Sequence, residues 1–362
     1  MRLTWLDLAG FRSYPSLHWK PDPGVNVIVG ANGAGKTNLL EAIGYLATLR
    51  SLRGVGDDAV VRVGETAAVV RGEAERGDST ALIELEISAR GRNRVLVNKR
   101  RPNRVSDLLG EVRAVTFLPD DLDLVKRGPA HRRQLLDEVA VQLAPAAALD
   151  QLEYDRALRQ RNSLLRQAQG RDPDPTTLAV WDARMSQAGA RVVLRRRAAM
   201  AAMTAHVVGT YEKLAGERTE IEMSYQTAWG DGGDETSLAH ALEAALVESR
   251  RADRERRTTT VGPHRDEPSL FIGHRSARTL ASQGEQRTLA LSLRLAAFWA
   301  VADVTGERPL LLLDDVFSEL DMGRAGALGA ALPAAQVFVT TARDDEVPVK
   351  GRRWDVAPGR VS

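Results

Sequence analysis

A glycine-rich segment near the N-terminus constrains the fold of this chain more than any other feature. Residues 30–37 read GANGAGKT, which matches G-x-x-x-x-G-K-[ST] at every fixed position. A short apolar run, Val25–Val29, precedes the segment, and apolar residues at helical spacing follow it. The sequence therefore predicts a buried strand, a tight loop and a helix. In this arrangement the backbone amides of the loop and the helix N-terminus can surround phosphate groups.

Each position of this phosphate loop has a predicted role toward ATP. Lys36 is expected to hold the β- and γ-phosphates, and Thr37 to supply a hydroxyl to Mg²⁺. The other predicted nucleotide-binding residues of the loop are Gly30, Ala31, Asn32, Gly33, Ala34 and Gly35.

A second motif lies far along the chain, where the apolar run Leu310–Leu313 is followed by Asp314 and Asp315. A buried strand would deliver Asp314 to the magnesium, directly or through water. Asp315 would then orient or deprotonate the attacking water. A hydrophobic run before two acidic residues is a weak signal alone. Together with the phosphate loop it predicts the second half of a nucleotide-binding site.

Composition excludes several classes. The 362 residues contain no cysteine, so disulfides, zinc-thiolate sites and thiol nucleophiles are ruled out, and a reducing compartment fits. The first residues lack the apolar run of a signal peptide, and no stretch approaches about 18 uninterrupted apolar residues, the length of a membrane span. We therefore expect a cytoplasmic protein with no membrane partner.

The pattern along the chain predicts an α/β fold. Short strands flank the phosphate loop and a β meander covers 58–98; a mainly helical block begins near Ala130, and strand character returns after Thr258. We expect an ATPase head with a β-rich lobe, interrupted by a helical domain that lacks a long coiled coil. The expected boundaries are 1–125 and 258–362 for the head and 126–257 for the insertion.

Ser282–Gln286 resembles the signature motif of ABC-type ATPases. That resemblance implies that Ser282, Gly284 and Gln286 contact nucleotide held by the other protomer of a head-to-tail dimer. The segment Ser318–Asp321 resembles the loop that crosses such an interface. Ser282 and Asp321 would then lie at the dimer interface, and Ser282 would join Lys36, Asp314 and Asp315 as a catalytic residue.

Longer strings narrow the resemblance to the RecF family of bacterial recombination mediators. They are FRS at 11–13, NLLEAI at 38–43, LPDDLDLVK at 118–126, GPHRD at 262–266 and the run 311–321. The resemblance implies an ATP-dependent DNA-binding homodimer with weak, DNA-stimulated ATPase activity. It also implies that the dimer acts with RecR, and indirectly RecO, to load recombinase at single-stranded gaps.

Resemblances to related DNA-repair ATPases and, around Arg53, to the arginine-bearing loop of the SMC relatives imply roles for further residues. Arg12 and Asn38 would contact nucleotide, and Arg53 would sense DNA or phosphate; a surface arginine is the alternative for Arg12 and for Arg53. His264 and Arg265 match a string whose role the sequence does not give, and a turn-stabilising role is favoured. Three departures from the ABC-type ATPase pattern point to slow turnover of ATP. Asp314–Asp315 stands where many of those enzymes have Asp-Glu, residues 340–343 contain no histidine, and no glutamine lies near Leu118.

Basic residues are grouped, although the formal net charge is only +2. The preferred DNA surface is a hairpin-and-loop region containing Arg90, Arg92, Arg94, Lys99, Arg100, Arg101 and Arg104. Lysine and arginine on one surface neutralise phosphates without reading sequence, so double-stranded DNA and single-strand/double-strand junctions are the expected partners. Further arginines in 191–197 and 250–257 offer weaker candidates, with solvated helix faces as the alternative.

Two alternative functions stay open. An ABC-type ATPase subunit coupled to another partner would lack DNA contacts, and salt-independent or absent DNA binding would favour it. A nuclease-linked ATPase would need a further metal-binding carboxylate cluster, and none is evident in the sequence.

Overall fold

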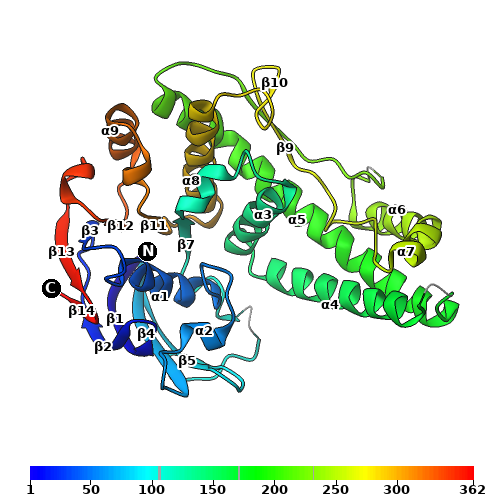
Figure 1. Cartoon of the computed structure of the whole chain (residues 1–362), viewed down its shortest axis with the longest axis horizontal. Helices are drawn as coiled ribbons and strands as arrows, with labels where there is room; N and C mark the ends of the chain where they lie inside the picture. The colour runs from blue at the N-terminus through cyan, green and yellow to red at the C-terminus, as the bar shows by residue number, and fades with distance from the viewer. Residues whose placement is uncertain (105–106, 170–171, 231) are drawn as a thin grey trace. The chain divides into compact units, whose positions relative to one another are not determined.

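The computed structural model describes residues 1–104, 107–169, 172–230 and 232–362 (Figure 1). The chain divides into two compact units. The first consists of Met1–Asp123, His206–Thr219 and Ser282–Ser362, and the second of Leu124–Ala205 and Glu220–Ala281. The domain boundaries expected from the sequence stay a prediction.

A six-stranded sheet forms one layer of the first unit, in the order β14-β13-β3-β12-β11-β7. Its strands from β13 to β7 run parallel, and β14 pairs antiparallel with β13 at the edge. The strands are β3 (Val25–Val29), β7 (Ala114–Phe117), β11 (Leu310–Asp314), β12 (Val337–Thr341), β13 (Arg352–Ala357) and β14 (Arg360–Val361). Every residue of β11 and β12 is buried, as expected of parallel strands covered on both faces.

The second layer is a five-stranded antiparallel sheet in the order β2-β1-β4-β5-β6. Its strands are β1 (Arg2–Phe11), β2 (Tyr14–Trp19), β4 (Ala67–Arg76), β5 (Ser79–Ser88) and β6 (Arg94–Val97). The predicted meander is confirmed except at its start, where Asp57–Val60 forms the short helix α2. Asp57 and Asp58 in the first turn of α2 favour the helix over the strand that the apolar residues suggested.

The helix α1 (Lys36–Thr48) lies between these two sheets, contacting β1 and β4 on one side and β7, β11 and β12 on the other (Figure 1). Its side chains Leu39, Leu40 and Ile43 are fully buried. Because α1 starts directly after the phosphate loop, the core that anchors this helix also fixes the loop.

The remaining elements of the first unit include α8 (Gln283–Thr305), α9 (Met322–Ala331) and the short 3-10 helices η2 (Pro119–Asp123), η3 (Phe317–Glu319) and η4 (Asp344–Glu346). Among the described residues, α8 is the one helix long and apolar enough to cross a membrane, and 78% of its apolar window is buried inside the protein. A buried helix of this kind is typical of a protein core.

The second unit is mainly helical. Its elements are α3 (Pro129–Leu143), α4 (Ala146–Gln167), the part of α5 (Pro175–Ala215) up to Ala205, α6 (Glu235–Glu248), α7 (Arg250–Arg256), β8 (Ile221–Ser224), β9 (Ser269–Ile272) and β10 (Arg275–Ser276). Arg161 is fully buried and pairs with Asp182 and Asp253 at 2.7 and 2.6 Å. The described residues contain no long coiled coil, and the predicted fold class is confirmed.

The loop around His264 is held within this unit by side-chain hydrogen bonds. The Nδ1 atom of His264 lies 2.6 Å from the Tyr154 hydroxyl, and its Nε2 lies 3.2 Å from the carbonyl oxygen of Thr259. Since a carbonyl only accepts, Nε2 carries the proton and Nδ1 accepts from Tyr154. The next carboxylate, Asp266, accepts from the Tyr225 hydroxyl and the Trp229 indole. These bonds support a turn-stabilising role for the GPHRD string.

Burial lowers the pKa of His264 from 6.5 to about 4, which predicts a pH-dependent stability. Between these two values the unfolded state binds the proton and the folded state does not. The free energy of unfolding should therefore fall as the pH falls from 6.5 toward 4 and be insensitive to this group above 6.5. Urea unfolding at several pH values should show a shallower slope between pH 5 and 6.5 in His264→Asn than in the wild type. An unchanged slope would contradict the assignment.

Candidate functional site

The parallel register brings three chain segments to one edge of the six-stranded sheet. Thr341 of β12 pairs with Val29, and Thr340 pairs with Asp314. The carboxyl ends of β3, β12 and β11 are thus neighbours, although their residues are up to 312 positions apart in the sequence numbering, from Val29 to Thr341. Polar groups at the ends of these strands therefore share one site.

The phosphate loop leaves β3 at Gly30 and enters α1 at Lys36. A Cβ atom on Gly30 would lie 2.5 Å from the carbonyl oxygen of Val356, so only glycine fits there. Gly35 has φ of 114° and, as the N-cap, has no side chain to occupy the first amides of α1. The Lys36 ammonium donates to the carbonyl oxygens of Gly30 and Ala31 at 2.7 and 3.2 Å. An anion entering the loop would meet the helix N-terminus and this ammonium together.

Thr37 and Asp314 meet across the edge of the sheet. The Thr37 hydroxyl donates to Oδ1 of Asp314 at 2.9 Å. A hydroxyl and a carboxylate are the hard oxygen ligands that Mg²⁺ prefers, and Mg²⁺ sites use few protein ligands beside phosphate oxygens. This donor pair beside the loop therefore fits a magnesium–nucleotide complex, although the described residues contain no group of three or more acidic or histidine side chains suited to a metal alone.

Asp315 occupies a less common backbone conformation with φ of 50°. Its amide donates to the Thr340 hydroxyl at 2.9 Å, and that hydroxyl donates to Asp314 at 2.7 Å. Burial raises the pKa of Asp315, with the charge of Lys36 opposing this shift. A carboxylate with a raised pKa is a stronger base, which suits a group that accepts a proton from water.

The β1–β2 turn packs against the phosphate loop. The Tyr14 hydroxyl donates to the carbonyl oxygen of Gly35 at 3.0 Å, and the Asn38 amide donates to the Ser13 hydroxyl at 2.9 Å. Arg12 donates to both carboxylate oxygens of the fully buried Glu41, at 2.8 and 2.9 Å. The turn thereby orients the loop, and the Arg12 guanidinium is engaged by a carboxylate of α1.

Arg53 lies near the same helix end. Its guanidinium is 3.4 Å from the side-chain oxygen of Asn38, and the Ser51 hydroxyl donates to Glu41 at 2.5 Å. The predicted residues Arg12, Asn38 and Arg53 therefore gather around the first turns of α1.

The signature segment forms the N-terminus of α8. The Ser282 hydroxyl accepts from the Glu285 amide at 3.2 Å, and the Glu285 carboxylate accepts from the Ser282 amide at 2.7 Å, which is a capping box. Arg324 lies against Gly284, because a Cβ atom there would be 2.4 Å from its Nη2. Arg324 also donates to Asp321 at 2.7 Å. Arg324 thus joins Gly284 to Asp321, and Ser282 caps the same helix, whereas Gln286 is buried.

The predicted DNA surface is a hairpin and its following loop. Asn98 and Lys99 have φ of 49° and 63°, as in a type I′ turn, and the flanking Val97 and Arg100 exchange backbone hydrogen bonds of 2.8 and 2.9 Å. The cationic side chains of this hairpin surface are all exposed; they are Arg90, Arg92, Arg94, Lys99, Arg100, Arg101 and Arg104. Arg94 lies 3.8 Å from Glu86.

Several arginines of the other two groups form ion pairs inside the second unit. Arg191 and Arg195 both pair with Asp150, at 2.8 and 3.1 Å, and Arg196 pairs with Asp137 at 2.6 Å. These contacts favour the reading of the 191–197 group as structural rather than as a phosphate-binding face. In the 250–257 group, Arg250 pairs with Asp182 at 2.8 Å.

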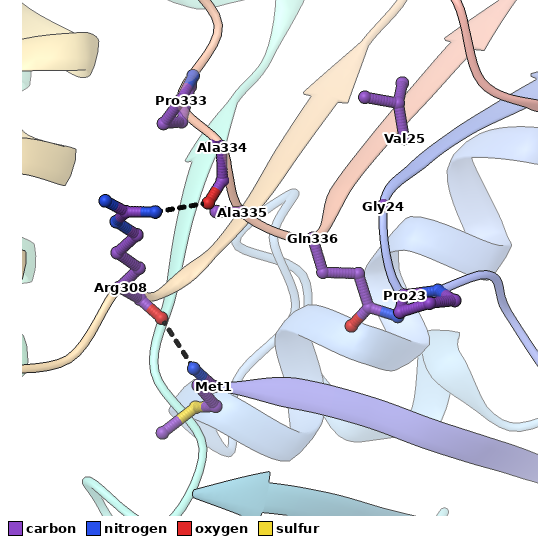
Figure 2. Close-up of a pocket in the computed structure, with 9 residues that line it drawn as sticks. All are labelled: Met1, Pro23, Gly24, Val25, Arg308, Pro333, Ala334, Ala335 and Gln336. Atoms are coloured by element: carbon purple, nitrogen blue, oxygen red, sulfur yellow. Dashed lines mark hydrogen bonds between the residues drawn. The ribbon is translucent and has the colours of Figure 1, made fainter. Parts of the chain in front are cut away.

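A hollow of about 450 Å³ lies at the opposite edge of the six-stranded sheet (Figure 2). It is lined by residues next to the amino ends of β3, β11 and β12, and the Met1 ammonium donates to the carbonyl oxygen of Arg308 at its rim. No residue predicted to bind nucleotide lines it. The hollow is therefore separate from the candidate site.

Sequence reasoning missed four residues of the site: Ser13, Tyr14, Glu41 and Thr340. Glu41 lies inside the string NLLEAI at 38–43, where a carboxylate in an apolar helix was the available signal. At Thr340 the sequence shows only that no histidine is present, which gives no indication of the hydroxyl's role.

Comparisons with known proteins agree with this architecture. A family model described as the RecF/RecN/SMC N terminal domain matches residues 2–356. The DNA replication and repair protein RecF of Streptomyces avermitilis is 42% identical over 371 residues, covering 100% of this chain and 99% of the relative. Two solved structures of the recombination mediator protein RecF in the RecFOR pathway, RecF-ATPrS and RecF-ATP, have TM-scores of 0.91 and 0.89. Each is 30% identical, and they cover 99% and 100% of this chain and 97% of their own chains.

The sheet order, the phosphate loop and the matching family model define an SMC-type head with an ATP-binding loop. Within that class, the full-length identity with curated relatives is decisive. The chain belongs to the RecF family.

Replacing Lys36 tests the phosphate loop. Lys36→Met keeps most of the side-chain stem and removes the ammonium, so ATP binding should weaken by about 10- to 100-fold, since a hydrogen bond to a charged group contributes about 1.5–3 kcal/mol. Titration with a fluorescent ATP analogue measures this. The exposed Lys20 provides the control, and Lys20→Met should bind as the wild type does. Tight binding by Lys36→Met would contradict the loop assignment.

Proposed function

We propose that this protein is an ATP-gated, DNA-binding recombination mediator. The observation that most supports the ATP part is the contact between Thr37 and Asp314 beside a phosphate loop whose helix N-terminus has no side-chain cap. The RecF relatives support the rest, because one is a DNA replication and repair protein and two are solved as ATP-type complexes of a recombination mediator.

In the proposed site, Lys36 and the rest of the phosphate loop, residues 30–37, bind the phosphates of ATP, and Thr37 and Asp314 hold Mg²⁺. When bound, Mg²⁺ neutralises charge on the phosphate oxygens. Asp315 orients the attacking water and accepts its proton, for which its raised pKa suits it. Arg12, Asn38 and Arg53 sit at the start of α1, where they can respond to nucleotide by exchanging their present partners.

Slow hydrolysis follows from the chemistry of the same site. Aspartate at 315 has a shorter side chain than glutamate and therefore reaches less far toward a water. Thr340 stands at the end of β12, and its hydroxyl is already engaged by the two aspartates. Turnover of this kind suits a switch or timer, and we expect DNA to stimulate it weakly.

We further propose that ATP joins two copies head to tail. The surface of Ser282, Gly284 and Asp321 would then face the nucleotide held by the other protomer. Because a capping box and Arg324 already order this surface, its assembly requires little rearrangement. Dimerisation would align the hairpin surfaces on double-stranded DNA or a single-strand/double-strand junction. RecR is the proposed direct protein partner, and RecO and the recombinase are proposed indirect partners.

The alternative is an ABC-type ATPase subunit that acts on another partner without contacting DNA. The exposed cationic hairpin surface favours the mediator. Absent or salt-independent DNA binding would favour the alternative.

Ser282 tests the dimer. Ser282→Arg should leave nucleotide binding by the monomer within about twofold and block ATP-dependent dimerisation, since a long charged side chain would project into the interface. Light scattering with a slowly hydrolysed ATP analogue and duplex DNA measures the mass. Ser282→Thr keeps the capping hydroxyl and adds one methyl group, so it should still dimerise. If Ser282→Arg dimerises normally, this residue lies outside the interface; if the wild type stays monomeric, the switch itself is wrong.

The hairpin tip tests the DNA surface. A double variant, Arg100→Ala with Arg101→Ala, should weaken duplex binding and lower the slope of log K against log salt by about 2, one unit for each phosphate contact. Fluorescence anisotropy at several salt concentrations with ATP present measures both quantities. The exposed Arg156 and Arg159 of α4, which lie outside all three basic groups, serve as the matched control pair. Equal slopes for the two double variants would refute the assignment of this surface.

A further inference from the structure

We propose that Thr340 is a positioning residue, which acts on the reaction through Asp314 and Asp315 and touches no substrate itself. The inference rests on the proposed ATPase function and deepens it. Thr340 is fully buried and is the fourth of five residues in β12, the strand between β3 and β11.

The hydroxyl of Thr340 has a defined hydrogen-bond direction. It lies 2.9 Å from the amide of Asp315, which can only donate, and 2.7 Å from Oδ1 of Asp314. The hydroxyl therefore accepts from the amide and gives its single proton to the carboxylate. This arrangement makes Oδ1 of Asp314 an acceptor and holds the carboxylate in one orientation.

The same bond fixes the backbone at Asp315. With φ of 50°, this residue is in the left-handed region, which side chains bearing a Cβ seldom adopt. The conformation turns the chain sharply at the end of β11, where Asp315 is half-buried while Asp314 is buried. Oδ1 of Asp315 is buried with no hydrogen-bond partner among the described residues, so this oxygen does not itself hold the side chain in place.

Thr340 also frees Thr37 for a ligand. Oδ1 of Asp314 accepts from both threonines, at 2.9 Å from Thr37 and 2.7 Å from Thr340. If the Thr37 hydroxyl turned toward Mg²⁺, the bond from Thr340 would still hold the Asp314 carboxylate. Asp314 would then need no reorientation to join Thr37 in holding the metal.

Three variants test this role. Thr340→Val has nearly the same shape but no hydroxyl, and Thr340→Ser keeps the hydroxyl. The control is Thr341→Val, because Thr341 is equally buried and its hydroxyl bonds to the carbonyl of Arg343 and to Glu346, not to the two aspartates.

For Thr340→Val we expect kcat to fall about tenfold, equivalent to about 1.4 kcal/mol, with KM within about twofold. The gain in affinity for a fluorescent ATP analogue on adding Mg²⁺ should shrink, whereas binding without Mg²⁺ should not change. Hydrogen exchange should accelerate in the segment around the Asp315 amide. Thr340→Ser and Thr341→Val should behave as the wild type in all three measurements.

Two results would overturn the proposal. One is wild-type kcat and wild-type exchange at Asp315 in Thr340→Val. The other is an equal loss in Thr340→Ser, which would assign the effect to packing of the methyl group rather than to the hydroxyl. If the wild-type protein binds no ATP, the proposed function fails, and the exchange at Asp315 still decides whether Thr340 holds that backbone.

Discussion

The candidate site depends on one carboxylate oxygen, Oδ1 of Asp314. It accepts hydrogen bonds from Thr37, at the start of α1, and from Thr340 in β12, while Asp314 itself ends β11. These bonds join segments that are 277 and 26 residues apart. They form because parallel strands place their carboxyl ends at one edge of the sheet. The core that aligns β3, β12 and β11 therefore sets the geometry of the site. Because both sheets pack against α1, the same core fixes the position of Thr37 at the start of this helix.

The phosphate loop and the signature surface are each ordered by their own side chains. Tyr14 holds the carbonyl of Gly35 in the loop, and Arg324 joins Gly284 to Asp321 on the signature surface. In both arrangements, side chains of this chain fix the backbone of the segment beside them. The residues with partners to exchange are the cationic ones, chiefly Lys36, whose ammonium now bonds to loop carbonyls.

Much of the fold was predictable because its signals are local. The apolar run at 25–29 and the leucines at 310–313 are strands, and the capping pattern S-x-x-E begins α8. Local signals failed where partners are distant in sequence. Whether Arg12 is available to a ligand depends on Glu41, 29 residues away, and the role of Thr340 depends on the register between β11 and β12. The strand expected at the start of the 58–98 meander was wrong for a different reason. Two aspartates in the first turn of α2 favour a helix there more than the few apolar residues favour a strand.

The arginines show why net charge predicts little and pairing predicts more. A formal charge of +2 does not distinguish a DNA-binding surface from a set of internal ion pairs. Arg191 and Arg195 share Asp150, so their charges are largely compensated within a few ångströms. The tip of the hairpin surface is different, because a type I′ turn presents Lys99 and Arg100 to solvent together. Since salt screens exposed charges beyond about 8–10 Å, a DNA backbone responds to such a local concentration and not to the total. The distribution of partners, rather than composition, is therefore the reason for proposing this surface as the DNA contact.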